Sequence, residues 1–317
     1  MPNDLSGQQF GRYRLVRRLG YGGFASVYLG QHVLLDAQQA AIKILHLTDI
    51  NVDAFRREAN TTATLVHPHI VRLLDFDIQQ DTPYLVLDYA PNGSLLNRHP
   101  KGSQLPLATI VQYVKDIATA LQYAHERNIV HRDIKPENIL VGRHNELLLS
   151  DFGIAVLSKT GRTSLEQNYN SAGTAEYMAP EMFKGKPEKA SGQYSLGIVV
   201  YEWLCGTPPF TEGNPIQLGF QHCYEPIPSL REKLSTVSER VEQVVMKALA
   251  KEPQQRYASV MQFAEALAEA SKAPPAGTCL LTYNGHSDLV TTLAWYSDGS
   301  RIASVSDDDT VQVWQAE

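Results

Sequence analysis

The spacing of apolar residues changes once along this 317-residue chain, and the change constrains the fold more than any other feature. Residues 12–46 and 70–90 place β-branched and aromatic residues at alternate positions, with glycine turns between the runs, which is typical of strands. One helix is predicted between them, over 53–65. Helical spacing dominates from residue 106 onward, over 107–128, 190–205, 237–250 and 258–271. The sequence therefore predicts an α+β fold with a strand-rich lobe, a helix-rich lobe and a cleft between them.

Composition narrows the class of protein. The net charge is −6, so no sequence-wide basic field favours nucleic acid or an anionic membrane. No apolar run reaches the roughly 18 residues that span a bilayer, and the first ten residues lack the pattern of a signal peptide. Cys205, Cys223 and Cys279 are scattered and form no CxxC pair, which argues against a disulfide framework or a zinc site. We therefore expect a cytoplasmic protein with no nucleic-acid partner and no membrane span.

Two short runs in the second half of the chain carry groups suited to phosphate chemistry. Residues 130–140 read VHRDIKPENIL, and they place Asp133, Lys135 and Asn138 on a short loop between apolar stretches. Asp151 begins a DFG run directly after the apolar stretch LLLS, which is predicted to be a strand. Two carboxylates, an amide and a lysine on such turns suit one task, which is to hold Mg²⁺ and a phosphate against a hydroxyl nucleophile.

A glycine-rich run near the start is a candidate phosphate loop. In LGYGGFASVY, Gly20 and Gly22 let the backbone approach phosphates with no Cβ in the way. Dinucleotide-binding folds also use such glycines, but here the run lies between two strand patterns and no helix follows directly. This context favours a hairpin over a dinucleotide crossover. Lys43, in the strand AAIKIL, is by itself consistent with an ordinary solvated strand lysine.

Together these motifs resemble those of bacterial eukaryotic-like (Hanks-type) protein kinases over about residues 12–270. Lys135 follows Asp133 by two positions, which is similar to the serine/threonine branch. The resemblance implies a bilobal protein kinase fold, with a β-rich N-lobe and a helical C-lobe. It also implies a serine/threonine protein kinase that uses ATP and Mg²⁺, phosphorylates protein hydroxyls and itself, and acts in bacterial signalling.

The resemblance assigns roles to individual residues. Asp133 would orient or deprotonate the substrate hydroxyl, and Lys135 would neutralise charge on the moving γ-phosphoryl group. Thr174, in GTAEYMAPE, would hydrogen-bond to both of these residues. Lys43 would contact the α and β phosphates, with Glu58 as its ion-pair partner.

The nucleotide and metal sites follow from the same resemblance. Asn138 and Asp151 would hold Mg²⁺, because an amide and a carboxylate offer the hard oxygen ligands that it prefers. Ala25 stands where relatives usually carry the third glycine of the loop, so we expect mild stiffening there and retained nucleotide binding. The residues expected to surround ATP, besides Lys43, are Leu19, Gly20, Tyr21, Gly22, Gly23, Phe24, Ala25, Ser26, Val27, Ala41, Leu87, Asp88, Ala90 and Leu140.

The segment after the DFG run is predicted to regulate the site. Glu181 would pair with Arg256 in a buried structural ion pair. Arg132 precedes the catalytic aspartate, as in kinases that are switched on by a phosphate in this segment. We expect autophosphorylation at Thr163 or a neighbouring hydroxyl, although Val156 stands where relatives often carry a second basic residue.

Gly192 departs from the family pattern. Its run KASGQYSLGIVV resembles the start of the central helix of the large lobe, where relatives carry aspartate at this position. That carboxylate would accept backbone N–H bonds from the catalytic loop near His131 and Arg132. Glycine accepts none, costs a helix about 1 kcal/mol relative to alanine, and leaves buried donors unpaired at roughly 1–3 kcal/mol more. We expect reduced activity or stability with an intact nucleotide site.

Beyond a Pro-rich linker at 271–278, residues 279–317 are predicted to form four short antiparallel strands. The segment resembles one WD-repeat blade of a β-propeller, with Gly285-His286 near its start, Val313-Trp314 near its end and Asp308 in the last turn. A blade buries its faces only against neighbouring blades. The segment is therefore the first blade of a truncated array, a remnant, or a docking element for a partner or another chain.

Two functions from different classes fit the combined sequence. The first is an active serine/threonine kinase fused to a WD-repeat segment, which the presence of Lys43, Asp133, Asn138 and Asp151 favours. The second is a pseudokinase scaffold that binds nucleotide and recruits partners, which Gly192 and the single blade suggest.

Overall fold

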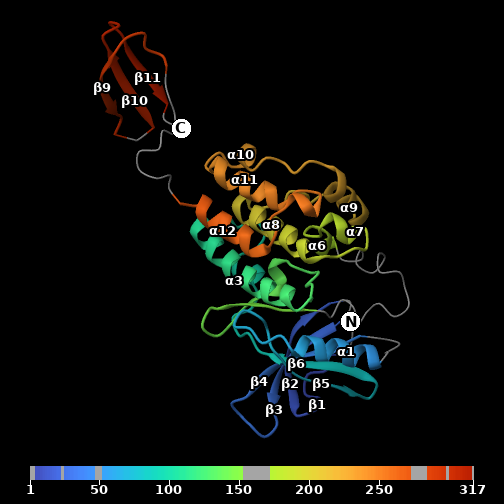
Figure 1. Ribbon diagram of the computed structural model, residues 1–317. Coiled ribbons are helices and arrows are strands. Elements are labelled where there is room, and N and C mark those ends of the chain that lie inside the picture. Colours follow the sequence, from blue (N-terminus) through green and yellow to red (C-terminus); the bar gives the residue numbers. More distant parts are fainter. Residues whose placement is uncertain are drawn as a thin grey trace. The chain divides into compact units, whose positions relative to one another are not determined.

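The computed structural model describes residues 4–22, 25–46, 52–152, 172–272, 284–297 and 300–315. The chain divides into two compact units, Met1–Lys272 and Ala273–Glu317. The first unit contains a strand-rich lobe followed by a helical lobe, which confirms the predicted fold class (Figure 1).

A six-stranded antiparallel sheet forms the strand-rich N-lobe, in the order β1-β2-β3-β4-β6-β5. A single helix, α1, packs against β5 through Phe55, whose ring meets that of Phe76 at 5.8 Å between centroids. The elements of this lobe are β1 (Gln9–Phe10), β2 (Tyr13–Tyr21), β3 (Ala25–His32), β4 (Gln39–Leu45), α1 (Val52–Ala63), β5 (Leu73–Gln79) and β6 (Thr82–Asp88).

The two faces of this sheet differ because side chains alternate along each strand. Tyr28 on β3 and Ile42 on β4 are buried in the core on one face. Val27 and Lys43, one position away on each strand, are only half-buried on the opposite face and lie directly across from each other. The half-buried face is therefore the one that carries the predicted phosphate-binding lysine.

The helical C-lobe is built around α8, whose residues from Ser191 to Leu204 are all buried. Helix α3 packs beside it and buries Ile110, Val114 and Leu121, which recur at helical spacing. The helices of this lobe are α2 (Leu95–Arg98), α3 (Leu107–Glu126), α6 (Ala172–Ala175), α7 (Pro180–Phe183), α8 (Lys189–Cys205), α9 (Pro215–Tyr224), α10 (Leu230–Lys233), α11 (Glu239–Ala248) and α12 (Val260–Ala270), with the 3₁₀ turns η1 (Pro136–Asn138) and η2 (Pro253–Gln255).

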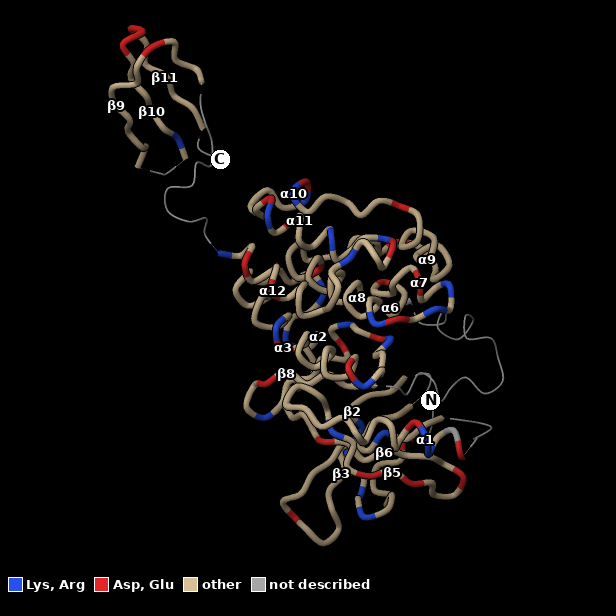
Figure 2. Tube along the Cα trace, in the orientation of Figure 1, with Lys and Arg blue, Asp and Glu red and all other residues tan. Residues whose placement is uncertain are grey.

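A small hairpin of β7 (Ile139–Val141) and β8 (Leu147–Leu149) follows η1 and ends directly before Asp151. Blue Lys and Arg segments and red Asp and Glu segments are interspersed through both lobes, as expected for a chain of small net charge (Figure 2). Within the described ranges, no helix combines the length and the apolar character needed to cross a membrane.

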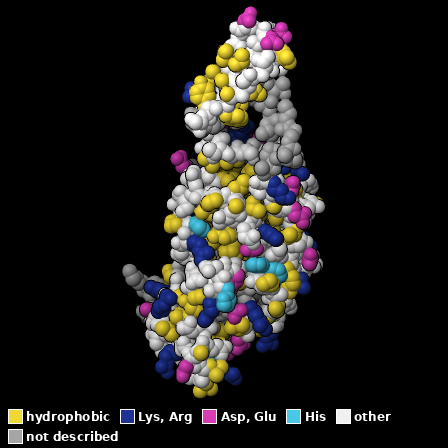
Figure 3. All heavy atoms as spheres, turned by 90° about the vertical axis from the view of Figure 1, so that its left-hand side faces the viewer, with side chains coloured by type: hydrophobic (Ala, Val, Ile, Leu, Met, Phe, Trp, Pro, Cys, Tyr) yellow, Lys and Arg dark blue, Asp and Glu magenta, His cyan; other side chains and the backbone are white. Residues whose placement is uncertain are grey.

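The second unit shows an antiparallel sheet in the order β11-β10-β9, with β9 (Val290–Trp295), β10 (Arg301–Ser306) and β11 (Val311–Gln315). A fourth strand was predicted, and the segment before residue 284 lies outside the described residues. Asp308 accepts a hydrogen bond from the Ser287 backbone (2.9 Å), and its Oδ2 lies 3.0 Å from Nδ1 of His286. Apolar side chains, among them Leu293 and Val311, lie at the surface of this unit (Figure 3).

Candidate active site

The loop between α3 and β7 brings together two predicted catalytic residues, Asp133 and Lys135, and a predicted metal ligand, Asn138, and Thr174 joins them from a distant segment. Nζ of Lys135 lies 3.0 Å from Oδ2 of Asp133 and donates to Oγ1 of Thr174 at 2.7 Å. Nδ2 of Asn138 donates to the backbone oxygen and to Oδ2 of Asp133, both at 2.8 Å. Lys135 and Asn138 therefore hold the Asp133 carboxylate in place, and the Thr174 hydroxyl holds Lys135. The roles assigned to these residues stay predictions, but the residues lie as close together as those roles require.

His131 fixes the backbone of this loop from behind. Its Nε2 lies 2.6 Å from the backbone oxygen of Ser150, and its Nδ1 accepts the backbone N–H of Asp133 at 3.2 Å. Burial lowers the pKa of His131 despite the nearby Asp133 carboxylate, so the ring is neutral and its proton is on Nε2. The ring also packs edge-on against Phe152, with 4.5 Å between ring centroids. Sequence reasoning missed this role, although the HRD and DFG runs contain both rings.

Lys43 of β4 reaches across from the sheet and pairs with Oδ1 of Asp151. Burial alone would raise the pKa of Asp151, but the Lys43 ammonium outweighs it, and the pKa lies below its ordinary value. Asp151 is therefore an anion at neutral pH, held at φ 67° at the end of the β8 strand. The pair joins the strand-rich lobe to the helical lobe at the position predicted for the phosphates and the metal.

The ion pair expected between Lys43 and Glu58 is not formed in this conformation. No ion pair within 4.0 Å joins these two residues, both of which the structure describes, because the ammonium is bound to Asp151 instead. Burial raises the pKa of Glu58, and the charge of Arg132 opposes that rise only partly. A cation placed beside this half-buried carboxylate would stabilise its ionised form. The role of Glu58 as the partner of Lys43 stays a prediction about another conformation.

The predicted nucleotide residues lie on neighbouring strands of the sheet and on the β7–β8 hairpin. Gly20 pairs with Val27 across the β2–β3 hairpin, and Ala41 pairs with Leu87 on β6. Leu140, in β7 of the helical lobe, is half-buried. The remaining described members lie in β2 (Leu19 and Tyr21), directly after it (Gly22), in β3 (Ala25 and Ser26), at the end of β6 (Asp88) and just beyond it (Ala90). Gly23 and Phe24 lie outside the described residues.

Asn138 and Asp151 fit a Mg²⁺ ion of the kind that retains water and phosphate ligands. The described residues contain no group of three His, Cys, Asp or Glu side chains able to hold a metal ion. Mg²⁺ is usually bound by only one or two protein carboxylates together with substrate phosphates, so a set of one amide and one carboxylate is sufficient. Asn138 uses its Nδ2 toward Asp133, and its amide oxygen takes no part in those two hydrogen bonds.

Glu181 and Arg256 form the predicted buried pair that anchors the end of the activation segment. Nη1 of Arg256 lies 2.8 Å from Oε1 of Glu181, and Nη2 lies 2.9 Å from Oε2. Burial would raise the pKa of Glu181, but the guanidinium and the hydroxyl of Ser191 lower it below the ordinary value. The residues predicted to carry phosphate, with Thr163 foremost, lie outside the described residues.

Gly192 is buried in the first turns of α8, and its nearest neighbours come from α3. A Cβ at this position would lie 3.8 Å from Nε2 of His125 and 3.8 Å from a methyl group of Leu121, which are ordinary contact distances. Nε2 of His125 is buried with no hydrogen-bond partner among the described residues. Outside the backbone of α8 itself, the polar atom nearest to a Cβ at position 192 is Nε2 of His125 on α3. Sequence reasoning missed this neighbour, because the ring faces Gly192 only in the folded chain.

A second group of carboxylates, which includes Glu137 of the catalytic loop, was also missed. The hydroxyl of Tyr177 donates to Oε2 of Glu202 at 2.7 Å, and Lys101 pairs with Glu176 at 2.7 Å. Burial raises the pKa of Glu202 to about 7, although the bond from Tyr177 lowers it. Oε2 of Glu137, beside Asn138 in the catalytic loop, is buried without a described partner.

Comparison with known protein families shows which family this chain belongs to. Residues 13–269 match the protein kinase domain family, so the chain belongs to this family. Residues 277–315 match the WD domain, G-beta repeat, as the blade resemblance predicted. These two matches run close to the predicted domain limits of 12–270 and 279–317, which stay predictions at the level of single residues.

Curated relatives are bacterial kinases. The chain is 34% identical over 252 residues to "Serine/threonine-protein kinase PrkC" of Bacillus subtilis (strain 168), covering 78% of this chain and 38% of that protein. It is 35% identical over 293 residues to "Serine/threonine-protein kinase PknB" of Mycobacterium leprae (strain TN), covering 89% and 46%. It is 37% identical over 275 residues to "Serine/threonine-protein kinase Pkn1" of Myxococcus xanthus, covering 84% and 39%. The chain thus spans less than half the length of these relatives.

Proposed function

We propose that this chain is a serine/threonine protein kinase that transfers the γ-phosphate of ATP to a protein hydroxyl in the presence of Mg²⁺. One observation carries the proposal. Asp133, Lys135, Asn138 and Thr174 form a connected cluster, and Lys43 reaches Asp151 at the neighbouring position. Membership of the protein kinase family and the names of the bacterial relatives support the same function.

Each residue of the cluster has a task in this reaction. The Asp133 carboxylate, oriented by Lys135 and Asn138, would accept a hydrogen bond from the incoming alcohol and take its proton as the new O–P bond forms, while the bond between the γ-phosphorus and the β-phosphate oxygen breaks and ADP leaves. Lys135 faces the transferring group and stabilises its negative charge. Mg²⁺, when bound with ATP, supplies positive charge that neutralises the phosphates and orients them for in-line attack. Asn138 and Asp151 would hold this ion.

The pair between Lys43 and Asp151 must open or rearrange for this reaction. In the proposed complex, Lys43 would contact the α and β phosphates, Glu58 would pair with its ammonium, and Asp151 would be free to hold the metal. The raised pKa of Glu58 supports this rearrangement, because a cation beside a half-buried carboxylate restores its ionised form. We propose that the conformation described here precedes nucleotide binding.

The acceptors are proposed to be serine and threonine hydroxyls of proteins, including hydroxyls of this chain itself between residues 154 and 172. The blade at 279–317 is proposed to dock a partner or further blades, because several of its apolar side chains are exposed. A location in the cytoplasm stays a prediction.

The decisive experiment incubates the purified chain with γ-labelled ATP and Mg²⁺ and follows label in protein. We expect labelled phosphoserine or phosphothreonine in the unaltered chain, and none after Asp133→Ala or after chelation of the metal. If both forms bind ATP and neither becomes labelled or labels a generic protein substrate, the chain is a nucleotide-binding scaffold, which is the alternative that Gly192 suggests.

A further inference from the structure

One histidine of the helical lobe is buried with a ring nitrogen that forms no hydrogen bond. His125, near the end of α3, is 5% exposed, and its Nε2 has no partner among the described residues. A ring nitrogen carries either a proton or a lone pair, so a donor or an acceptor is left unsatisfied here. Because such a group costs free energy when it is removed from water, the nitrogen marks a place where a ligand would be stabilised.

Gly192 of α8 leaves space in front of this nitrogen. A Cβ at position 192 would lie 3.8 Å from Nε2 of His125 and 3.8 and 3.9 Å from the two methyl groups of Leu121, which are ordinary contact distances. Gly197 of the same helix differs, because a Cβ there would lie only 2.9 Å from a methyl group of Leu249. Close packing therefore requires glycine at position 197, whereas the glycine at position 192 leaves room that no packing contact demands.

The charges around this space favour an anion. Burial, together with the charges of Lys189 and His131, lowers the pKa of His125 to about 4, and no carboxylate among the described residues opposes this shift. Gly192 is the fourth residue of α8, so the positive end of the helix dipole adds to the same field. A small anion placed here would find a buried donor in Nε2–H of His125 and would not meet a competing negative charge.

The catalytic loop contributes further donors close to His125. His131 lies near enough for its charge to act on His125. The backbone N–H groups of His131 and Arg132 donate to no acceptor among the described residues. Arg132 is also held at φ 70°, in the left-handed region that few residues other than glycine adopt. An acceptor in this space would therefore stabilise a part of the loop that lacks hydrogen bonds of its own.

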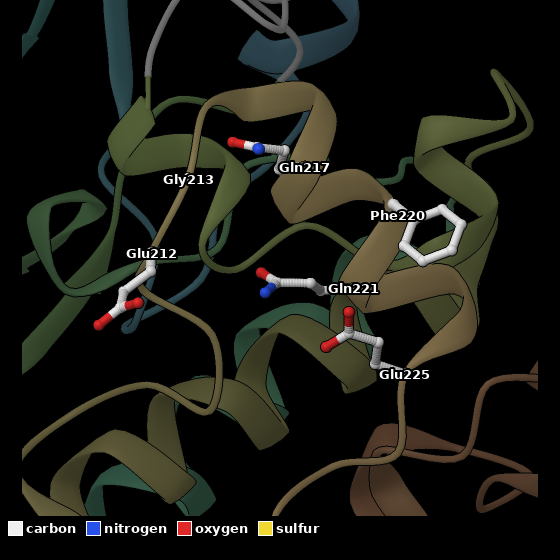
Figure 4. Close-up of a pocket in the computed structure, with 6 residues that line it drawn as sticks. All are labelled: Glu212, Gly213, Gln217, Phe220, Gln221 and Glu225. Atoms are coloured by element: carbon white, nitrogen blue, oxygen red, sulfur yellow. The ribbon is translucent and has the colours of Figure 1, made fainter.

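A hollow on the surface of the same lobe has the opposite chemistry. It measures about 450 Å³ and lies between α9 and the preceding loop, lined by Glu212, Gly213, Gln217, Phe220, Gln221 and Glu225 (Figure 4). Oε1 of Gln221 is an acceptor without a donor among the described residues, and the two carboxylates make the hollow negative. A small anion is therefore disfavoured in this hollow and favoured beside Gly192.

We propose that the space beside Gly192 binds a small carboxylate, of the size of formate or acetate, which accepts the Nε2–H of His125. The bound anion supplies the negative charge that α3 and α8 lack here, and it offers acceptors to the N–H groups of the catalytic loop. Lys189 and Asn128 are exposed and bind each other at 3.0 Å, three residues from Gly192 and His125 respectively, so the space is close to the surface. Binding there involves no nucleotide and no phosphoryl transfer.

Thermal unfolding of the full chain in sodium formate tests the proposal without an assay of activity. Sodium chloride at equal ionic strength serves as the reference salt. Two variants alter the site, since Gly192→Asp brings its own carboxylate and His125→Phe removes the donor. The matched control is His144→Phe, which replaces an exposed histidine in the turn between β7 and β8.

We expect formate to raise the melting temperature of the unaltered chain and of His144→Phe saturably, and to act on neither site variant beyond the effect of chloride. A ligand of three heavy atoms reaches a Kd of about 1 mM at best. At ten times the Kd the rise should be about 3–6 °C.

Nuclear magnetic resonance of the chain with ¹⁵N-labelled histidine gives a second readout. Formate should raise the pKa of His125, whose signal is identified by its loss in His125→Phe, and should leave that of His144 unchanged. If His125→Phe does not fold, Gly192→Asp and the histidine titration decide. The proposal is overturned if formate acts no more than chloride, if Gly192→Asp responds as the unaltered chain does, or if the titration of His125 ignores formate, because water alone then occupies the space.

Discussion

Replacing Gly192 with aspartate should stabilise the helical lobe, and the structure gives the expected size of the effect. A Cβ here meets only ordinary contact distances, 3.8 Å to Nε2 of His125 and 3.8 Å to Leu121. Gly192→Ala should therefore gain about 1 kcal/mol from helix propensity alone. Aspartate ranks only just above glycine as a helix former, so Gly192→Asp gains only about 0.3 kcal/mol from propensity. Its carboxylate would accept a hydrogen bond from Nε2 of His125, a bond to a charged group worth roughly 1.5–3 kcal/mol, from which the cost of burying the carboxylate is subtracted.

The comparison of Gly192→Asp with Gly192→Ala isolates this hydrogen bond. For a domain of this size, each kcal/mol shifts the melting temperature by roughly 2–4 °C. We expect alanine to raise it by about that amount and aspartate to raise it further, through the hydrogen bond with His125. Differential scanning calorimetry measures both values, and label transfer from ATP shows whether the tighter support also raises activity.

The pH dependence provides a second readout of the same contact. Burial lowers the pKa of His125 to about 4, whereas the unfolded chain takes up its proton near 6.5. The unfolded state therefore binds more protons between these values, and stability is lost as the pH falls through this window. A carboxylate at position 192 favours the protonated ring, so the advantage of aspartate over alanine should grow from pH 7 to pH 5. Equal melting temperatures for the two variants at every pH would refute the reasoning.

Three further predictions follow from other contacts. Arg256→Met leaves the Glu181 carboxylate buried without its partner, and it should cost about 3–5 kcal/mol in the free energy of unfolding, measured by urea titration; a loss below 1 kcal/mol would contradict the burial of this pair. Glu202→Gln should stabilise the protein increasingly as the pH rises from 5 to 8, because the folded-state pKa of about 7 makes the native acid harder to ionise than the unfolded one; melting temperatures that run parallel to those of the unaltered chain would refute it. Asp151→Asn should remove the dependence of ATP affinity on Mg²⁺ in calorimetric titrations, and a variant that still responds to the metal would show that the ion is held elsewhere.

The sequence predicted the local features of this structure better than the contacts between distant segments. The catalytic loop was predicted residue by residue, because Asp133, Lys135 and Asn138 are neighbours in one short motif whose backbone brings them together. The predicted limits of α3 and α12 were close to the observed ones, because both helices have long periodic patterns of apolar residues. Helix α9 was not predicted, because its 10 residues are too few to give a long periodic pattern.

Contacts between distant segments could not be read from the chain. The sequence predicted that Lys43 meets Glu58, but the structure pairs it with Asp151, because either carboxylate can satisfy the same ammonium and the choice depends on how α1 sits against the sheet. Similarly, Gly192 was recognised as a departure, but its neighbour His125 appears only once α3 and α8 pack together. Such choices are set by packing, which no local pattern encodes.

The central claim is that Asp133 acts on the alcohol while other residues hold the nucleotide, and one measurement separates these tasks. ATP affinity and the rate of phosphate transfer at saturating ATP are determined on the same preparations of the unaltered chain, Asp133→Asn and the exposed control Asp53→Asn. The account predicts that Asp133→Asn keeps its ATP affinity while transfer falls by at least about a hundredfold, and that Asp53→Asn changes neither. Transfer that persists in Asp133→Asn, or a loss of ATP binding equal to the loss of transfer, would contradict it.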